Sequence, residues 1–368
     1  MKATAVAPSN IAFIKYWGKK DEKLNIPQNG SISMNLSNLL TTTTVEFSGD
    51  LKEDVVTINQ KLLSYSSSER SESRSDVIPD PIGNLDSRFR GNDKPGSSRQ
   101  PRTIKESSDI DRIVKHLDTV RSLARINHRA KVVTKNNFPT STGLSSSASG
   151  FAALTLAASY AAGLNLSEKE LSILARQGSG SACRSIPDGF VEWLDGDSNE
   201  TSYAVSLLPP GFWDIVDVAV VVSKNKKEIP TSKGQKIANS SPFFPVRLAR
   251  IKEKIKLIKK HMQEKNFPAF GELIEHEALE LHAIMLTSTP PLIYWLPATV
   301  SVMHAVQKWR KDGLEVYFTV NTGQDIHLIC QKKDAKEVAR KVSRLPEVSR
   351  VTKNIPSVGA RIISTHLF

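Results

Sequence analysis

The sequence predicts an α+β fold, because strand patterns fill the first part of the chain and helix patterns fill the last part. Residues 31–36 alternate polar and apolar side chains, and residues 41–47 form a β-branched run, as is typical of strands. From Pro242 onward, apolar residues recur at helical spacing. The 368 residues, with 39% hydrophobic content, are enough for a large core and one or two domains.

The remaining elements follow from the same patterns. In the first half, strands are predicted at residues 2–8, 31–36, 41–47, 55–59 and 130–134, and helices at 110–126 and from a serine-rich run to Gly163. Ser167 stands three residues before Glu170, which is the spacing of a capping box at a helix start. Later strands are predicted at residues 190–193, 216–222, 316–320, 326–330 and 359–364, and helices at 246–264, 269–285, 294–311 and 335–344.

The segment 64–102 differs from the rest of the chain in composition. Ser, Arg, Asp, Pro and Gly dominate it, and its few apolar residues show no period. Such a segment cannot bury enough surface to offset the entropy lost on ordering. We predict a disordered insertion there; a lid or a partner-binding segment is the alternative.

Composition excludes several classes of protein. No apolar run approaches the roughly 20 residues of a membrane helix, and the N-terminus lacks the pattern of a signal peptide. Cys183 and Cys330 are the only cysteines, which argues against a disulfide framework. Two cysteines suit a reducing compartment, so we predict a cytoplasmic protein without a membrane partner.

A basic run between Arg247 and Lys265 contributes much of the formal net charge of +12. Isoleucines recur through it at helical spacing, so the favoured interpretation is the solvated face of an amphipathic helix. Nucleic-acid binding is disfavoured because no aromatic residues are interleaved with the charges. Anionic small molecules remain as partners for the other basic residues.

A loop rich in small residues leads into an Ala-rich apolar helix at residues 137–158. A loop of this kind aims backbone N–H groups at one point, where the helix dipole adds partial positive charge. Its serines add hydroxyl groups for phosphate oxygens or a magnesium ion. The loop lacks the endings of a Walker A loop and the spaced glycines of a Rossmann fingerprint. Serine as an ordinary N-cap is the alternative.

Three stretches carry a resemblance to known families. Residues 139–148 read Pro-x-x-x-Gly-Leu-Ser-Ser-Ser-Ala and resemble the phosphate-binding motif of the GHMP kinase superfamily. Residues 7–19 and residues 178–185 resemble the diphosphomevalonate decarboxylase family within it. The resemblance covers the chain from about Ala5 onward, apart from the insertion. It implies a ribosomal-protein-S5-like domain at residues 1–205 and a ferredoxin-like domain at residues 206–368, with the site in the cleft between them.

The resemblance also implies a reaction. It is the ATP-dependent decarboxylation of mevalonate 5-diphosphate to isopentenyl diphosphate, ADP, phosphate and carbon dioxide, a step of isoprenoid biosynthesis. ATP turns a tertiary alcohol, a poor leaving group, into a phosphate ester, and loss of carbon dioxide then supplies electrons as phosphate departs. Such a site holds two polyphosphates, Mg²⁺ and a carboxylate, and it acts mainly by positioning and charge stabilisation.

The candidate residues are those at positions that match functional residues of the family. Arg184 is expected to orient the leaving carboxylate, because a guanidinium can bind it with two parallel bonds. The other substrate-binding candidates are Tyr16, Lys19, Ser179, Ser181 and Thr231, with Lys19 also counted as catalytic. The ATP-binding candidates are Pro139, Gly143, Ser145, Ser146, Ser147 and Ala148, with Ser147 near the γ-phosphate and the metal ion. Lys15 is given a supporting role toward phosphate, whereas Trp17 and His282 are interpreted as structural.

Asn321 departs from the family pattern. Relatives carry Asp-Ala-Gly-Pro-Asn at this turn, and that aspartate is the proposed base for the substrate hydroxyl, whereas this chain reads Asn321-Thr322-Gly323-Gln324-Asp325. An amide cannot accept a proton at neutral pH, although it can hydrogen-bond the hydroxyl. The base is then dispensable, or Asp325 replaces it, or the reaction has changed.

Several functions therefore stay open beside the decarboxylase. A kinase of a mevalonate-type 3-hydroxyl and a phosphomevalonate decarboxylase belong to the same class, and an inactive nucleotide-binding protein belongs to another. Arg184 and Lys19 favour decarboxylation, whereas Asn321 weakens it. We expect small-molecule partners, no nucleic acid, and a homodimer.

Overall fold

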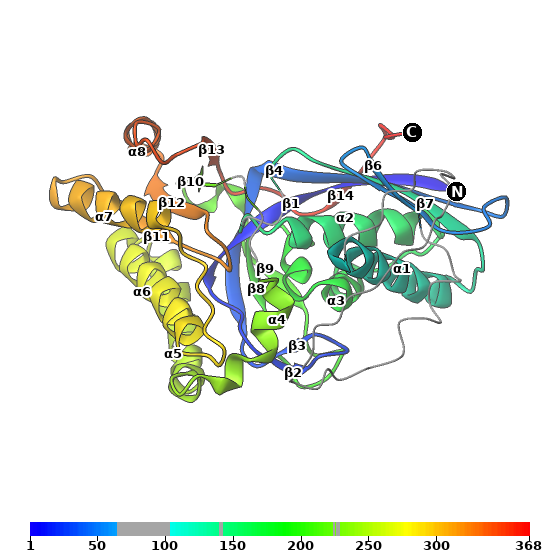
Figure 1. The fold of residues 1–368 in the computed structure, drawn as a ribbon, viewed down its shortest axis with the longest axis horizontal. Helices are drawn as coiled ribbons and strands as arrows, with labels where there is room; N and C mark the ends of the chain where they lie inside the picture. The colour runs from blue at the N-terminus through cyan, green and yellow to red at the C-terminus, as the bar shows by residue number, and fades with distance from the viewer. Residues whose placement is uncertain (65–103, 140–142, 224, 226–228) are drawn as a thin grey trace, which may run out of the picture.

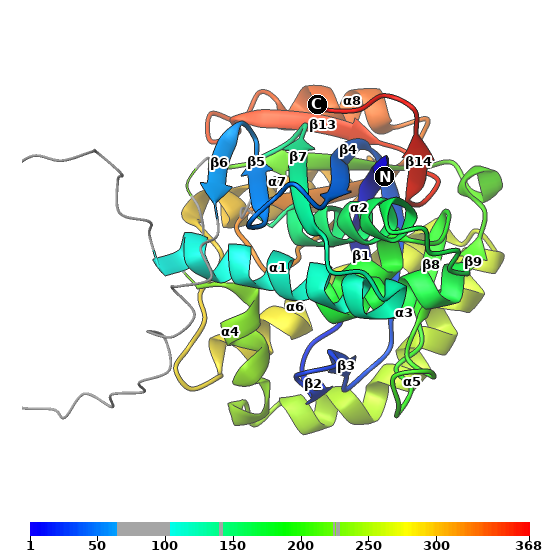
Figure 2. The ribbon, with the colours of Figure 1, turned by 90° about the vertical axis from the view of Figure 1, so that its right-hand side faces the viewer.

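Two sheets organise the computed structural model, which describes residues 1–64, 104–139, 143–223, 225 and 229–368 (Figure 1). The larger sheet has the strand order β14-β1-β4-β7-β5-β6, and β8 and β9 extend it beyond one part of β4. Figure 2 shows β6, β5, β7 and β4 side by side in this order. The strands are β1 (Lys2–Ile14), β4 (Ser31–Ser48), β5 (Val55–Ile58), β6 (Lys61–Ser64), β7 (Arg129–Asn136), β8 (Phe190–Trp193), β9 (Ala204–Leu208) and β14 (Arg361–Ile363).

Strand β4 is one continuous strand of 18 residues rather than the two strands predicted. It pairs with β1 along most of its length, and the register shifts between Pro8 and Asn10 of β1. This shift accommodates the extra residues 36–39 of β4. The sequence pattern had placed a connection at residues 37–40, between the two predicted strands. The two long strands carry the chain from the larger sheet toward the second half of the molecule (Figure 1).

Three helices cover one face of the larger sheet: α1 (Ile104–Ala124), α2 (Ser146–Ala161) and α3 (Glu168–Gly178) (Figure 1). Alanines on both sides of the contact, among them Ala5 of β1 and Ala153 of α2, are fully buried and let the central helix α2 lie close to the sheet. At the start of α3, Ser167 and Glu170 form the predicted capping box.

The second sheet is ferredoxin-like, as the resemblance implied. Its strands are β10 (Ile215–Val221), β11 (Val316–Thr319), β12 (Ile326–Gln331) and β13 (Arg350–Asn354), in the antiparallel order β11-β12-β10-β13. The helices α5 (Phe244–Gln263), α6 (Phe267–Leu286) and α7 (Pro297–Lys311) precede β11, and α8 (Ala335–Val342) joins β12 to β13. This is the β-α-β-β-α-β connection of a ferredoxin-like unit.

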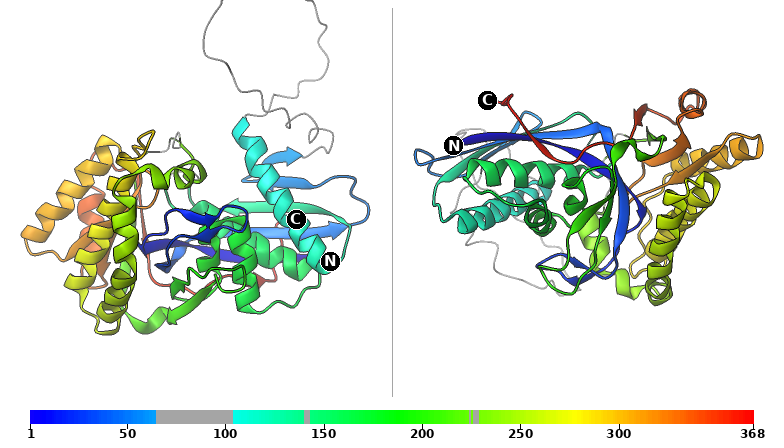
Figure 3. Two further views of the ribbon diagram at one scale, coloured as in Figure 1. Left: turned by 90° about the horizontal axis from the view of Figure 1, so that it is seen from below. Right: turned by 180° about the vertical axis from the view of Figure 1, so that it is seen from behind.

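The two halves share a hydrophobic core. Phe13 of β1 packs edge-on against Phe270 of α6, with ring centroids 4.9 Å apart, and Met34 of β4 and Ile258 of α5 lie in the same cluster. Figure 3 shows α5 and α6 side by side next to the long strands. Strand β9 spans the predicted division at residues 205 and 206, and β14 pairs with β1, so both halves contribute to the larger sheet. The exact domain boundary stays a prediction.

Three further predictions concern the chain as a whole. The predicted insertion at residues 64–102 lies outside the described residues except for Ser64, and its disorder stays a prediction. Cys183 and Cys330 are both buried and free, as expected for a chain without a disulfide framework. Within the described ranges, no helix is long and apolar enough to cross a membrane.

Candidate active site

A cleft of about 560 Å³ lies where the two halves meet. The end of β1, the start of α2, the 3-10 helix η3 (Gly180–Ser185), the short helix α4 (Thr231–Lys236) and the turn after β11 all contribute residues to it. The predicted site residues that line this cleft are Tyr16, Lys19, Gly143, Ser145, Ser146, Ser147, Ala148, Ser179, Ser181, Arg184, Thr231 and Asn321. Pro139, predicted to bind ATP, is not among its lining residues.

The serine-rich loop reaches the cleft in a left-handed backbone conformation. Gly143 has φ +124° and Ser145 has φ +57°, and α2 begins at the next residue, Ser146. A Cβ atom at Gly143 would lie 3.2 Å from the Cα of Gly323, so this glycine lets the loop approach the turn after β11 closely. Ser9 of β1 donates a hydrogen bond of 2.5 Å to the carbonyl of Leu144 and holds the loop from the other side.

Ser145 does not cap the helix that follows it. Its side chain makes no capping bond and instead accepts a hydrogen bond of 3.1 Å from the amide of Asn321. The first N–H groups of α2 have no partner within the helix, and the helix dipole adds partial positive charge at this end. The exposed hydroxyl of Ser147 lies in the same first turn. The start of α2 therefore has the features of a phosphate-binding site.

Arg184 is held rigidly at the wall of the cleft, with only 4% of its surface exposed. Its Nη1 donates to the hydroxyl of Ser31 at 2.6 Å, and its Nη2 donates to Oδ1 of Asn10 at 3.1 Å. Its buried Nε has no hydrogen-bond partner in the part of the chain that the structure describes. Burial lowers the pKa of Arg184, but a guanidinium stays protonated in proteins. A fixed cation with an unused donor can bind an anionic group such as a carboxylate.

Tyr16 and Lys19 line the cleft beside Arg184. The ring of Tyr16 packs edge-on against Trp193 at 4.6 Å, and burial raises the pKa of its hydroxyl. Nζ of Lys19 donates to Oδ1 of Asn25 at 2.6 Å, and burial lowers its pKa. Both residues extend from the segment that follows β1, so their position depends on how the end of β1 is fixed. Trp17, between them in the sequence, is fully buried, as predicted.

Asn321 is held by contacts on three sides. Its Oδ1 accepts a hydrogen bond of 3.1 Å from Nζ of Lys15, and its Nδ2 donates to Ser145. Its backbone carbonyl lies 3.0 Å from Nε2 of His282. His282 stacks on Trp295, and burial lowers its pKa to about 3, so the imidazole is neutral at pH 7. His282 contacts the turn that carries Asn321, and its structural role stays a prediction.

Asp325 does not replace the missing carboxylate. Its side chain is fully buried, and its Oδ1 accepts a hydrogen bond of 3.1 Å from the backbone of Val222. Asp325 is not among the residues that line the cleft. The interpretation in which Asp325 reaches the site from a rearranged turn is therefore not supported by this structure.

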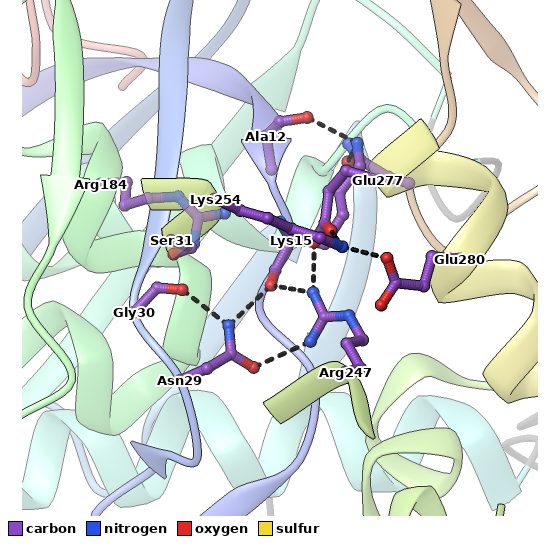
Figure 4. Close-up of polar contacts among 11 residues, drawn as sticks. Ala12, Lys15, Asn29, Gly30, Ser31, Arg184, Arg247, Lys254, Glu277 and Glu280 are labelled. Atoms are coloured by element: carbon purple, nitrogen blue, oxygen red, sulfur yellow. Dashed lines mark hydrogen bonds and ion pairs between the residues drawn. The ribbon is translucent and has the colours of Figure 1, made fainter. Parts of the chain in front are cut away.

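A buried ion cluster fixes the end of β1 (Figure 4). Glu277 of α6 pairs with both Arg247 and Lys254 of α5. Glu277 accepts a hydrogen bond of 3.0 Å from the backbone N–H of Lys15. Arg247 donates a hydrogen bond of 2.8 Å to the backbone carbonyl of Lys15. Lys254 also pairs with Glu280. Both backbone groups of Lys15 are thus bonded to charged side chains from the second half of the molecule.

This cluster corrects the interpretation of the basic run between Arg247 and Lys265. The run forms a helix and most of its basic residues are exposed, as predicted, but Arg247 and Lys254 are buried with Ile251 and Ile258 on its inner face. Their spacing puts all four on one stripe of the helix. Glu277 offsets the cost of burying these cations, and its position could not be read from the run itself.

Several residues of the site were missed in the sequence. Asn10 and Ser31 position Arg184, and both are buried polar residues in strands. No sequence signal marked them, because Asn10 follows the polar Ser9 and Ser31 belongs to an alternating polar and apolar pattern. The cleft is also lined by residues of α1, namely Arg112, Lys115, His116 and Thr119. Burial lowers the pKa of His116 to about 4, so it is neutral at pH 7.

The residues present fit a magnesium ion only in combination with a phosphate ligand. Within the described part of the chain, no group of three or more His, Cys, Asp or Glu side chains could hold a metal ion. Mg²⁺ commonly keeps several waters and binds mainly through substrate phosphates. A serine hydroxyl at the start of α2, such as that of Ser147, is a suitable protein ligand in that arrangement.

Two family models match this chain. The model described as diphosphomevalonate decarboxylase-like N-terminal domain matches residues 7–88 and 99–204, and the model described as mevalonate 5-diphosphate decarboxylase C-terminal domain matches residues 218–361. The chain belongs to the diphosphomevalonate decarboxylase family. The diphosphomevalonate decarboxylase of Debaryomyces hansenii is 33% identical over 91% of this chain and 81% of its own length. The phosphomevalonate decarboxylase of Haloferax volcanii is 30% identical over 93% and 92%.

Solved structures of the family resemble the whole chain. The mevalonate diphosphate decarboxylase of Staphylococcus aureus aligns with a TM-score of 0.83 and 34% identity, covering 99% of this chain and 98% of that one. A structure of the enzyme abbreviated MDDEF, which contains MVAPP, AMPPCP and magnesium, aligns with a TM-score of 0.82 and 31% identity over 99% of both chains. The two-domain architecture of the GHMP kinases is therefore that of this chain.

Proposed function

We propose that this chain catalyses the ATP-dependent decarboxylation of mevalonate 5-diphosphate to isopentenyl diphosphate, ADP, phosphate and carbon dioxide. One observation carries the proposal: a single cleft holds both the serine-rich start of α2 and the buried guanidinium of Arg184. The first binds phosphate groups and the second binds a carboxylate. A reaction that joins phosphoryl transfer to decarboxylation needs both in one site.

ATP binds with its phosphates at the start of α2. Gly143 permits the turn, the N–H groups of α2 face the phosphate oxygens, and Ser145, Ser146 and Ser147 supply hydroxyl groups. Ser147 would be the protein ligand of Mg²⁺, which would neutralise charge on the phosphates. The MDDEF structure, which holds AMPPCP and magnesium together with MVAPP, supports both co-substrate and metal.

The substrate occupies the remainder of the cleft. Arg184 binds its carboxylate, and Asn10 and Ser31 keep the guanidinium in one orientation. Tyr16, Lys19, Ser179, Ser181 and Thr231 bind its diphosphate. Thr231 begins α4, and its hydroxyl lies 2.8 Å from the hydroxyl of Thr322. This contact connects α4 to the turn after β11.

A second candidate is decarboxylation of the monophosphate. The similarity to the phosphomevalonate decarboxylase of Haloferax volcanii favours it. Lys19 and Thr231 would then bind a single phosphate group instead of a diphosphate. Placing the chain in the mevalonate pathway of isoprenoid biosynthesis fits either substrate. A homodimer and a cytoplasmic location stay predictions.

The two candidates are separated by the product formed. The purified protein is incubated with ATP, Mg²⁺ and either mevalonate diphosphate or mevalonate monophosphate, and the products are identified by mass spectrometry. We expect isopentenyl diphosphate from the diphosphate and no decarboxylated product from the monophosphate. The reverse pattern would assign the chain to phosphomevalonate decarboxylation, and product from neither substrate would contradict both assignments.

A further inference from the structure

We propose that the side-chain amine of Lys15, in its neutral form, is the base that takes the proton from the substrate hydroxyl during phosphorylation. This inference deepens the proposed function and rests on it. It gives Lys15 a chemical role, where the sequence had suggested only support for a phosphate group. It also explains how the site can work with an amide at position 321.

The hydrogen bonds of Lys15 match those of a neutral amine. Nζ donates to the backbone carbonyl of Ala12 at 2.5 Å (Figure 4). It also donates to Oδ1 of Asn321 at 3.1 Å. A neutral amine has two N–H groups and one lone pair, so these two acceptors use both of its hydrogens. No third acceptor for Nζ occurs among the described residues. Because Lys15 lines the cleft, its lone pair is available to a bound hydroxyl group.

Asn321 cannot take the proton itself. Its Nδ2 donates to Ser145, which directs Oδ1 toward Lys15, and an amide oxygen is not basic at neutral pH. An aspartate at this position would instead face Nζ with a negative charge and would favour the ammonium form of Lys15. The amide therefore serves as an uncharged acceptor that leaves the neutral amine stable.

Burial and two neighbouring cations favour the neutral amine of Lys15, and two carboxylates oppose them. Its side chain is 2% exposed, and burial is the largest influence on its pKa, followed by Glu277 of α6, which raises it. Arg184 of η3 and Arg247 of α5 lower the pKa, and Asp217 of β10 raises it. The result is a pKa of about 7, against an ordinary value of 10.5. Glu277 favours the ammonium form only in part, because its carboxylate is shared between Arg247 and Lys254.

The step balances without any further reactant. The substrate O–H bond breaks and its proton moves to the lone pair of Nζ, which becomes an ammonium group. The hydroxyl oxygen forms a bond to the γ-phosphorus of ATP, and the bond from that phosphorus to the β,γ-bridging oxygen breaks with its electron pair going to ADP. The new ammonium group then lies beside the phosphorylated oxygen, where its charge favours departure of the phosphate.

The first test compares the pH dependence of kcat/KM in the wild type and in Asn321→Asp. In the wild type the active form is the neutral amine, so activity should fall as the pH drops below about 7. In Asn321→Asp the new carboxylate takes the proton and raises the pKa of Lys15, so the acid limb should move to lower pH. Both proteins use the same ATP and substrate, so ionisation of these phosphates cannot cause a difference between the profiles.

The second test substitutes the amine. Lys15→Arg keeps a cation but supplies no base, so turnover in the wild-type background should fall about 10²–10⁴-fold. In the Asn321→Asp background the same substitution should cost less than about tenfold, because the carboxylate now accepts the proton. Circular dichroism and thermal melts check that each variant is folded.

Acetylation of Lys15 gives a readout that does not depend on activity. The rate of its reaction with acetic anhydride, followed by peptide mass spectrometry, should reach half its maximum near pH 7 in the wild type and at higher pH in Asn321→Asp. Coincident pH limbs, or full activity of Lys15→Arg in the wild-type background, would overturn the assignment while leaving the proposed function intact. A wild type that forms neither ADP nor carbon dioxide at any pH would instead refute the proposed function.

Discussion

The orientation of Arg184 is set by the protein before any substrate binds. Ser31 and Asn10 each accept a hydrogen bond from one N–H group of Arg184. The guanidinium carbon lies 5.8 Å from the centroid of the Trp193 ring. The guanidinium is planar, so two fixed bonds determine the plane in which the remaining donors lie. A lysine could keep the charge of this position but not that plane.

We therefore expect Arg184→Lys to separate the two half-reactions. ATP binding should be retained, whereas release of carbon dioxide should fall by roughly 10- to 100-fold, since one hydrogen bond to a charged group contributes about 1.5–3 kcal/mol. The measurement is carbon dioxide release at saturating ATP. Arg176→Lys is the matched control, because Arg176 is also buried but bonds to Ser202 and Asn199 rather than to residues of the cleft. Equal losses in the two variants would contradict a carboxylate-binding role.

Sequence reasoning at this scale succeeded where the residues belong to a contiguous motif. Arg184 and Ser145 were predicted from the glycine- and serine-rich loops around them, and both line the cleft. Asn10 was missed as a partner of Arg184, because the two are 174 positions apart in the chain.

At the scale of elements, the ion cluster between α5 and α6 connects the ferredoxin-like half to the end of β1. Glu277 carries two cations and one backbone N–H of Lys15, and its side chain is fully buried. Burial alone would raise the pKa of Glu277, but Arg247 and Lys254 reverse this, so its pKa lies below the ordinary value of 4.5. The carboxylate is therefore ionised at pH 7 and holds all three partners.

Glu277→Gln should destabilise the fold by about 3–5 kcal/mol, because it leaves the buried Arg247 without its counter-charge and Lys254 with Glu280 alone. Chemical denaturation at pH 7 measures this loss. Glu264→Gln is the control on the adjoining segment, since Glu264 forms only an exposed pair with Lys260 at 3.9 Å, and its effect should stay within about 0.5 kcal/mol.

The same variant has a defined pH dependence. A carboxylate whose folded pKa is lowered stabilises the protein above its unfolded pKa, and this contribution is lost as the pH falls. The stability difference between wild type and Glu277→Gln should therefore shrink as the pH drops below 4.5. A difference that stays constant through this range would show that the charge of Glu277 is not what stabilises the contact.

Local patterns predicted the elements well and their pairing less well. The capping box of α3 and strand β8 appear at the predicted residues, because both signals lie within a few positions. Strands β9 and β13 were not predicted, since their pairing with β8 and β10 is decided in three dimensions. The burial of Arg247 likewise depends on a carboxylate 30 positions away.

For the whole molecule, the site exists only where the two halves meet. Arg184 and the start of α2 come from the first half, whereas Asn321 and the ion cluster come from the second. The shared core around Phe13 and Phe270 holds these parts together. The sequence predicted both halves and the cleft through resemblance, but the segment 64–102 and the exact domain boundary remain predictions.

The central claim is that this cleft couples phosphorylation to decarboxylation although Asn321 stands where a carboxylate was expected. The most direct measurement follows ADP and carbon dioxide in parallel, with purified wild-type protein, ATP, Mg²⁺ and mevalonate diphosphate. We expect equal molar amounts of the two products throughout the reaction. ADP formed without carbon dioxide would identify a kinase, and the absence of both products would identify an inactive nucleotide-binding protein; either result would contradict the claim.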